Sequence, residues 1–392
     1  MPFIHHFVTF CCRFLVYPND SDGNPFHNEL VPLAVSSPAL LHAMSAVAAG
    51  HLNRSRCQQD VAAAKHYSIA LHELKTALSN PTVARSDSTL GACLLLCVYE
   101  ISHSENCRWL EHLQGARDLI LFRGGPKTTD YLSRFFSLLD VSGSIFSGGG
   151  TLLEGNYWLA DALGSPDSGK GAATAIPNFP AYDPTGNNSN HFHQLMVYMV
   201  KMSRLSADSL RPEMDQAQVR TKAVGVIKEL NAWWTSCPPS IRDQRIDWRY
   251  QSRPQKLTVA ETLEEEGISS IKSCYYGCLI YLHHILDPLA LEPQRIEATQ
   301  SIRGIIDIAK HTPKGYGLEM GLYFGLFMAG VAIFNSPQDE ELLRRRLKTD
   351  TKVSIYHADR CLELLEVLWG RQHTYDMKYD WRQVQKQMGI QV

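Results

Sequence analysis

The stretch SSPALLHAMSAVAAGHL, residues 36–52, decides the fold class. Ser36 and Ser37 supply hydroxyls that can cap a helix, and Pro38 then falls in the first turn, where a backbone N–H is not needed. Apolar side chains follow at the spacing of a helix, at positions 40, 41, 44, 47, 48 and 52. The stretch therefore predicts a helix that buries one face against other helices.

The helical pattern continues on both sides of this stretch. Towards the N-terminus, apolar residues at positions 3, 4, 7, 10, 11 and 14 fit one helix face. Further helices are expected at 61–78, from a cap at Asp87 to Ile101, and at 107–123, 215–236, 258–286, 293–311, 318–335, 338–348, 352–369 and 379–388. No run alternates strictly between apolar and polar residues, which argues against a sheet. The sequence predicts an all-α fold, an irregular antiparallel bundle of about 12 or more helices.

One long segment interrupts the helical pattern. Within residues 146–190, the 27 residues from Gly164 to Asn190 include four glycines and four prolines, which disfavour a continuous helix. We expect a long Gly/Pro-rich loop at 164–190, within an internal loop or linker at 146–190 that joins two helical halves. The expected organisation is one helical domain over residues 1–392.

The charge of the chain is close to balanced. Lys and Arg number 38 and Asp and Glu number 40, which gives a formal net charge of −2. Such a chain has no overall attraction to nucleic acid or to an anionic membrane. Residues 318–334 carry a single charge, but they are fewer than the roughly 20 residues of a membrane span. Gly317, Gly321 and Gly325 in this region are better explained by close helix packing, so no membrane segment is expected.

The cysteines favour a reducing compartment. Ten are present, and no two form a C-x2-C pair, which excludes most zinc-finger and thioredoxin-type sites. Cys93 and Cys97, like Cys274 and Cys278, lie one helical turn apart in apolar runs, as buried thiols do. The sequence predicts an intracellular protein with no bound metal and no cofactor.

Few residues carry a catalytic pattern. His284 and Asp287 are three residues apart on an expected helix and could form an oriented acid/base pair, and His112 is a second candidate acid or base. No G-x-S-x-G elbow is present, which disfavours an ordinary serine hydrolase. The segment from Gly164 to Gly171 resembles a phosphate-binding loop, but its last residue lacks the hydroxyl that holds Mg²⁺, so nucleotide binding is not expected.

Two further groups of residues have a structural and a functional interpretation. Four aromatic residues on expected buried helices could line a ligand cavity or form plain core: Trp109, Tyr275, Tyr323 and Phe327. A basic run could act as a nuclear-import patch or form a solvated helix face, since acidic residues precede it: Arg344, Arg345, Arg346 and Lys348.

Several blocks resemble the fungal-specific transcription factor domain, the regulatory domain of zinc binuclear cluster regulators. The blocks are NPF at 24–26, LVPLAVSSPALLH at 30–42, AVAAGHL at 46–52, TLGACLLL at 89–96, WLEHLQGA at 109–116, MAGVAIF at 328–334 and DWRQV at 380–384. The resemblance implies a helical regulatory or effector-binding domain. Members usually carry an N-terminal cluster of six cysteines that reads DNA, whereas this sequence starts at the regulatory domain without the C-x2-C-x6-C pattern. Direct sequence-specific DNA binding is therefore not expected.

Two functions follow as hypotheses. In the first, the protein is a transcription regulator of a filamentous fungus, located in the nucleus. It controls a secondary-metabolite gene set through other transcription regulators or a DNA-binding partner, with a small apolar effector compatible with its aromatic interior. In the second, the same scaffold is an enzyme or a carrier of a small apolar ligand in secondary metabolism. The cytoplasm is the alternative location to the nucleus. The apolar, glycine-faced helices are compatible with a homodimer.

Overall fold

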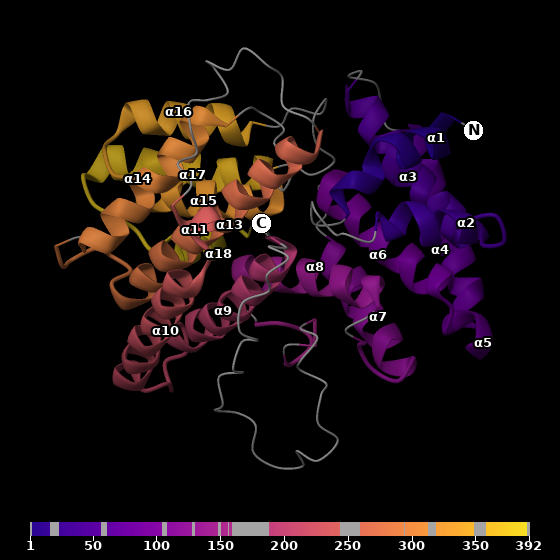
Figure 1. Cartoon of the computed structure of the whole chain (residues 1–392), viewed down its shortest axis with the longest axis horizontal. Helices are drawn as coiled ribbons and strands as arrows, with labels where there is room; N and C mark the ends of the chain where they lie inside the picture. The colour runs from indigo at the N-terminus through magenta and orange to yellow at the C-terminus, as the bar shows by residue number, and fades with distance from the viewer. Residues whose placement is uncertain are drawn as a thin grey trace. The chain divides into compact units, whose positions relative to one another are not determined.

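The structure is a computed structural model that describes residues 2–15, 23–55, 61–103, 108–127, 130–147, 150–155, 157–158, 188–243, 259–293, 295–312, 319–348 and 358–389. Within these ranges the chain forms 17 α-helices and no strand, which confirms the predicted all-α fold (Figure 1). Most of the expected loop at 164–190 lies outside the described residues, as does the loop that resembles a phosphate-binding motif.

The described residues fall into two compact units. The first lies within Met1–Val16, Asp20–Asp140 and Leu152–Gln194, and the second within Val141–Thr151 and Leu195–Val392. A single domain over residues 1–392 stays a prediction.

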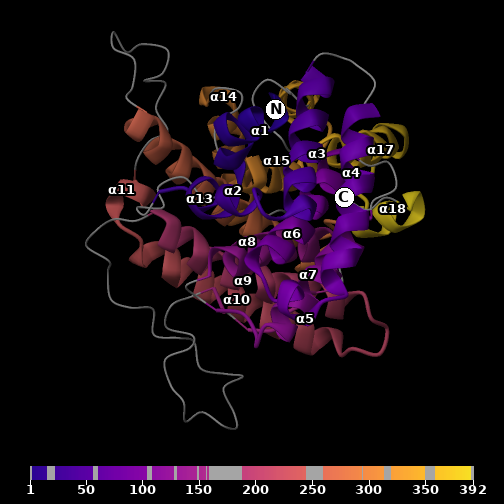
Figure 2. The ribbon, with the colours of Figure 1, turned by 90° about the vertical axis from the view of Figure 1, so that its right-hand side faces the viewer.

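The first unit is organised around α3 (Pro38–Ser55), the helix that the opening stretch predicts. Leu40, Met44 and Val47 of this helix are fully buried. α3 packs against α1 (Pro2–Thr9), α4 (Val61–Leu78) and α6 (Asp87–His103), and α6 packs against α7 (Trp109–Phe122) (Figures 1 and 2). Shorter elements complete the unit: a 3-10 helix at Cys11–Phe14, a π-helix at Phe26–Leu30, α2 (Val31–Leu33) and α5 (Pro81–Ala84).

The second unit is organised around α13 (Val259–Leu286). This helix packs against α10 (Gln216–Ser236), α14 (Ile296–His311) and α15 (Glu319–Ala332). The remaining helices are α11 (Pro239–Arg242), α16 (Pro337–Leu347), α17 (Asp359–Tyr375) and α18 (Trp381–Met388). Two more helices, α8 (Tyr131–Ser147) and α9 (Asn188–Ser209), contribute residues to both units.

Three details differ from the sequence-based expectations. The cap of α6 is Ser86 and not Asp87, because the backbone N–H of Thr89 donates to the Ser86 hydroxyl at 3.2 Å. Asp87 instead forms an ion pair with Arg123. α8 was not expected, and α17 ends at Tyr375 and not at residue 369.

The described cysteines are buried and unbridged, as their apolar spacing predicts. Eight free, buried cysteines lie in the ranges given above. Burial raises the pKa of the Cys93 thiol to about 12, which keeps it protonated and unreactive. No described helix is long and apolar enough to cross a membrane. No group of three or more His, Cys, Asp or Glu side chains suited to a metal ion occurs among the residues of known placement.

Helices α13 and α15 approach each other closely through glycine. A Cβ atom at Gly325 would lie 2.7 Å from the carbonyl oxygen of Ser273, and one at Gly277 would lie 2.8 Å from the ring of Phe324. Such distances leave no room for a methyl group. The expected packing role is confirmed for Gly325, whereas the Gly317 position and the surroundings of Gly321 lie outside the described part of the chain.

We expect Gly325→Ala to lower the free energy of unfolding by about 1–3 kcal/mol, because the added methyl group meets the α13 backbone. Gly370→Ala on α17 is the matched control, since nothing lies within 4 Å of its Cβ position. This control should raise stability by up to about 1 kcal/mol through helix propensity alone. Urea unfolding followed by circular dichroism measures both changes, and equal effects would contradict the close approach.

Candidate functional site

The densest polar cluster of the second unit begins at the DWRQV block. Asp380 is the N-cap of α18, and its carboxylate accepts the backbone N–H of Arg382 at 3.0 Å. The same carboxylate accepts two guanidinium donors of Arg382, Nε at 2.9 Å and Nη2 at 2.8 Å. This two-point contact is the strong form of an ion pair. Both residues are buried, with exposed fractions of 4% and 8%.

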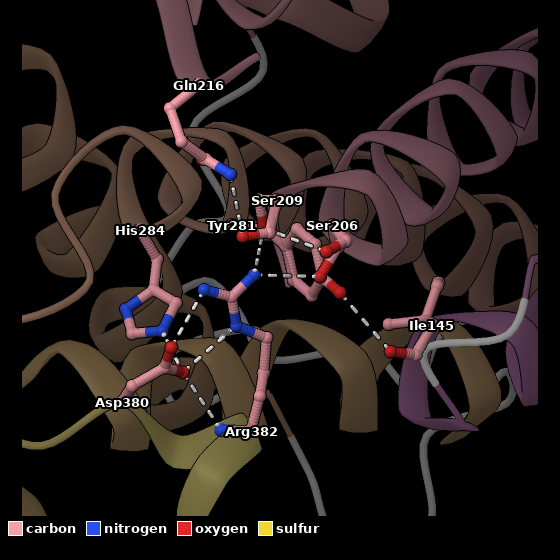
Figure 3. A network of polar contacts seen from close by, with 8 residues as sticks. All are labelled: Ile145, Ser206, Ser209, Gln216, Tyr281, His284, Asp380 and Arg382. Carbon is pink, nitrogen blue, oxygen red and sulfur yellow. Dashed lines mark hydrogen bonds and ion pairs between the residues drawn. The ribbon is translucent and has the colours of Figure 1, made fainter. Parts of the chain in front are cut away.

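The remaining guanidinium nitrogen of Arg382 reaches another helix. Nη1 donates to the hydroxyl oxygens of Ser206 at 3.0 Å and Ser209 at 2.8 Å, both on α9 (Figure 3). On the opposite side of the carboxylate, His284 of α13 lies with its Nε2 at 3.1 Å from Asp380. One ion pair therefore joins α9, α13 and α18.

The electrostatics of this cluster fix its protonation. Burial alone would raise the pKa of Asp380, but hydrogen bonds from His284 and Arg382 outweigh burial and hold that pKa below its usual range. Burial lowers the pKa of His284, so its neutral form donates Nε2–H to the carboxylate. The result is one ionised pair with a neutral histidine beside it.

Tyr281 extends the cluster. Its hydroxyl donates to the Ile145 carbonyl oxygen at 3.3 Å (Figure 3). Trp381 covers the cluster, with ring centroids 6.0 Å from Tyr281 and 5.1 Å from Phe327. These contacts make the cluster part of the interior of the second unit.

A pocket of about 80 Å³ lies beside the cluster. It is formed where α13 and α15 end and α14 begins, and His284 belongs to its wall. The other polar residues that line it are His283, Asp287, Glu292, Arg295, Lys378 and Tyr379. The described part of the chain thus places one histidine, His284, in both the ion-pair cluster and the pocket.

The acid/base pair expected between His284 and Asp287 has a different geometry. His284 is hydrogen-bonded to Asp380. The carboxylate of Asp287 accepts the backbone N–H groups of Leu291 and Glu292, each at 2.9 Å. Asp287 therefore shapes the turn after α13, and both residues still line the same pocket.

The candidate aromatic residues of the second unit do not line this pocket. Tyr275 donates to the Asn231 side chain at 2.8 Å and stacks on Trp234 at a centroid distance of 4.2 Å. Phe327 is fully buried between Phe146 and Trp381. Tyr323 is half-buried on α15.

His112 and Trp109 lie on α7 in the first unit. The Nε2 atom of His112 is 2.9 Å from the hydroxyl of Tyr67, and Glu100 lies close enough to affect the pKa of that hydroxyl. Burial lowers the pKa of His112, and burial together with Glu100 raises the pKa of Tyr67. Glu100 is 5% exposed, and its Oε2 atom has no hydrogen-bond partner among the residues that the structure describes. Trp109 is buried beside this group.

The group of Glu100, Tyr67 and His112 combines three titratable side chains. The Tyr67 hydroxyl is within hydrogen-bonding distance of His112, and the buried Glu100 acts on the same hydroxyl electrostatically. No pattern in the sequence points to Tyr67, which is 45 residues from His112.

The basic run on α16 is only partly free. Arg344 pairs with Glu341 at 2.8 Å and with Glu366 at 2.5 Å, and Arg346 donates to the carbonyl oxygen of Thr312 at 2.7 Å. Arg345 and Lys348 are exposed. A nuclear-import role of this run stays a prediction.

Comparison with known proteins finds a match to one family model. The sequence model of the fungal specific transcription factor domain matches residues 2–392. Among curated proteins, the chain is 31% identical over 127 residues to the acriflavine sensitivity control protein acr-2 of Neurospora crassa. That match covers 30% of this chain and 21% of the relative, so it concerns a minor part of both. No solved structure matches the chain.

We expect Arg382→Met to lower the free energy of unfolding by about 3–5 kcal/mol, because the Asp380 charge stays buried without its partner. The double variant Asp380→Asn with Arg382→Met should cost less, since asparagine still caps α18 and no buried charge remains. Urea unfolding measures both variants. A double variant less stable than the single one would overturn this account of the ion pair.

We expect the free energy of unfolding to fall as the pH drops below 6.5, the ordinary pKa of histidine. Burial lowers the pKa of His112 and of His284, so the unfolded chain takes up these protons at a higher pH than the folded chain. The stability is therefore full above pH 6.5 and is lost as the pH falls through the lowered values.

Denaturant unfolding at a series of pH values measures this dependence. The variant His112→Gln should reduce the slope of the free energy of unfolding against pH. The reduction should be at most the slope that the uptake of about one proton contributes. An unchanged slope in that variant would show that His112 is not held neutral by the fold.

Proposed function

The chain belongs to the family of the fungal specific transcription factor domain, and from this premise we propose that it controls a set of secondary-metabolism genes through a DNA-binding partner or other transcription regulators. The observation that carries the proposal is the family match over residues 2–392, nearly the whole sequence. The relative in Neurospora crassa, named as a control protein, supports the same broad role.

The chemistry of the chain supports action through a partner. A net charge of −2 gives little attraction to DNA phosphates, which dominate the affinity of DNA-binding proteins. No C-x2-C pair occurs in the 392 residues to hold a zinc cluster. In this proposal the partner reads the promoter, the helical chain regulates the partner, and both work in the nucleus.

A second candidate function is favoured by the group of Glu100, Tyr67 and His112. A buried carboxylate oxygen without a partner in the described residues, next to a tyrosine and a neutral histidine, resembles an acid/base site. In this alternative the scaffold serves as an enzyme or carrier for a small apolar metabolite. The two functions differ in what a change at His112 does in the cell.

We expect a strain without this gene to lose the transcripts of a co-regulated gene set, because a regulator acts on expression. Transcript profiling against the parent strain measures this loss. Reintroducing the wild-type chain, or the variant His112→Gln, should restore the transcripts.

The enzyme or carrier alternative gives the opposite pattern. Transcripts stay unchanged in the deletion strain, a metabolite disappears or its precursor accumulates, and His112→Gln fails to restore it. That pattern would refute the proposed role as a transcription regulator.

A further inference from the structure

We propose that the pocket between the ends of α13 and α15 and the start of α14 binds the carboxylate group of a small organic acid. The pocket would be the effector site of the proposed regulator, and this assignment of role rests on the proposed function. The binding itself rests only on the groups that line the pocket.

The acidic and imidazole groups of the pocket already have partners. The carboxylate of Asp287 accepts two backbone N–H groups, and that of Glu292 pairs with Arg220 at 3.0 Å. His283 lies 2.8 Å from Glu297, and His284 is held by Asp380. Each of these groups is thus held in place by at least one protein partner.

One terminal carbonyl group of each of the two helices is also satisfied. A helix C-terminus normally attracts cations through its free carbonyl groups. Here Arg220 donates to the Leu286 carbonyl oxygen at 2.9 Å, and Lys378 donates to the Ala332 carbonyl oxygen at 2.9 Å. At Leu286 and Ala332 the pocket therefore offers no free carbonyl oxygen that would attract a cation.

The unused capacity of the pocket consists of donors. Lys378 gives one N–H to Ala332, and neither Lys378 nor Arg295 forms an ion pair within the described ranges of the chain. Asp287 and Glu297 act on these two cations only at longer range. The first turn of α14 adds backbone donors, because its N-cap residue, Arg295, makes no side-chain cap. Two cations and an uncapped helix N-terminus favour an anion.

The rest of the wall limits the anion to a small organic acid. Ile280, Leu286, Val331 and Ala332 line the pocket with apolar surface, which suits a short hydrocarbon body. A volume of about 80 Å³ corresponds to roughly five to eight water positions at 10–15 Å³ each, so it holds a ligand of similar heavy-atom number. Inorganic phosphate would leave the apolar wall without contacts.

Isothermal titration of the full chain with butyrate tests the site. Butyrate should bind, whereas butyramide and inorganic phosphate should bind about tenfold more weakly, because the first lacks the charge and the second lacks the apolar body. Binding should weaken at alkaline pH, earlier than for an ordinary lysine, because burial lowers the pKa of Lys378.

Two variants and a control locate the binding. Lys378→Gln and Arg295→Gln should each weaken butyrate binding about tenfold, the effect of losing one charged hydrogen bond. Arg295 is exposed, so its variant keeps the fold even if Lys378→Gln disturbs the end of α15. Lys310→Gln on the exposed face of α14 should leave binding unchanged.

Three outcomes would overturn the carboxylate site: no binding of butyrate, equal binding of butyramide, or binding that both pocket variants leave intact. Tighter binding of phosphate would overturn the organic-acid class. If butyrate binds as expected but the deletion strain keeps its transcripts, the carboxylate site is supported. The proposed role as a transcription regulator is then refuted.

Discussion

The second unit depends on one buried positive charge, the guanidinium of Arg382. An arginine cannot lose its proton to avoid burial, so the surrounding chain must satisfy its donors. Asp380 does so from the turn before α18, and Ser206 and Ser209 do so from α9. The carboxylate must in turn stay ionised, which the donation from His284 supports. The placement of three helices thus follows from one ion pair that would be costly to break.

This cluster and the adjacent pocket divide two tasks between neighbouring residues. Four of the five N–H donors of Arg382 are bound to protein oxygens, so the cluster has little left to offer a ligand. Lys378, two residues before the same carboxylate, keeps donors available and lies in the pocket wall. His284 touches both, since its ring belongs to the wall and its Nε2 atom holds Asp380. A ligand in the pocket would therefore meet a residue that helps to fix α18.

Helices can be predicted from the sequence where the buried residues are apolar and recur at helical spacing, as in residues 36–52. α8 carries a helical pattern too, since Leu132, Phe135, Phe136 and Leu139 recur at helical spacing and are each at most 3% exposed. The serines and glycine at 142–144 have weak helix propensity and lead into the Gly-rich segment, which masks this helix in the sequence. The candidate histidines were found by residue type, but their partners were not, because Tyr67 is 45 residues from His112 and Asp380 is 96 residues from His284. Partners so distant are set by tertiary packing.

The same distances bear on how the chain is made. Arg382 meets Ser206 across 176 residues, and Gln385 donates to the Phe146 carbonyl oxygen across 239 residues. Synthesis on the ribosome delivers residues in order, and domains generally fold as units as they emerge. The helices around α3 can pack while translation continues. The second unit must wait for residue 382, because until then Ser206 lacks its guanidinium partner and Tyr281 lacks the ring of Trp381.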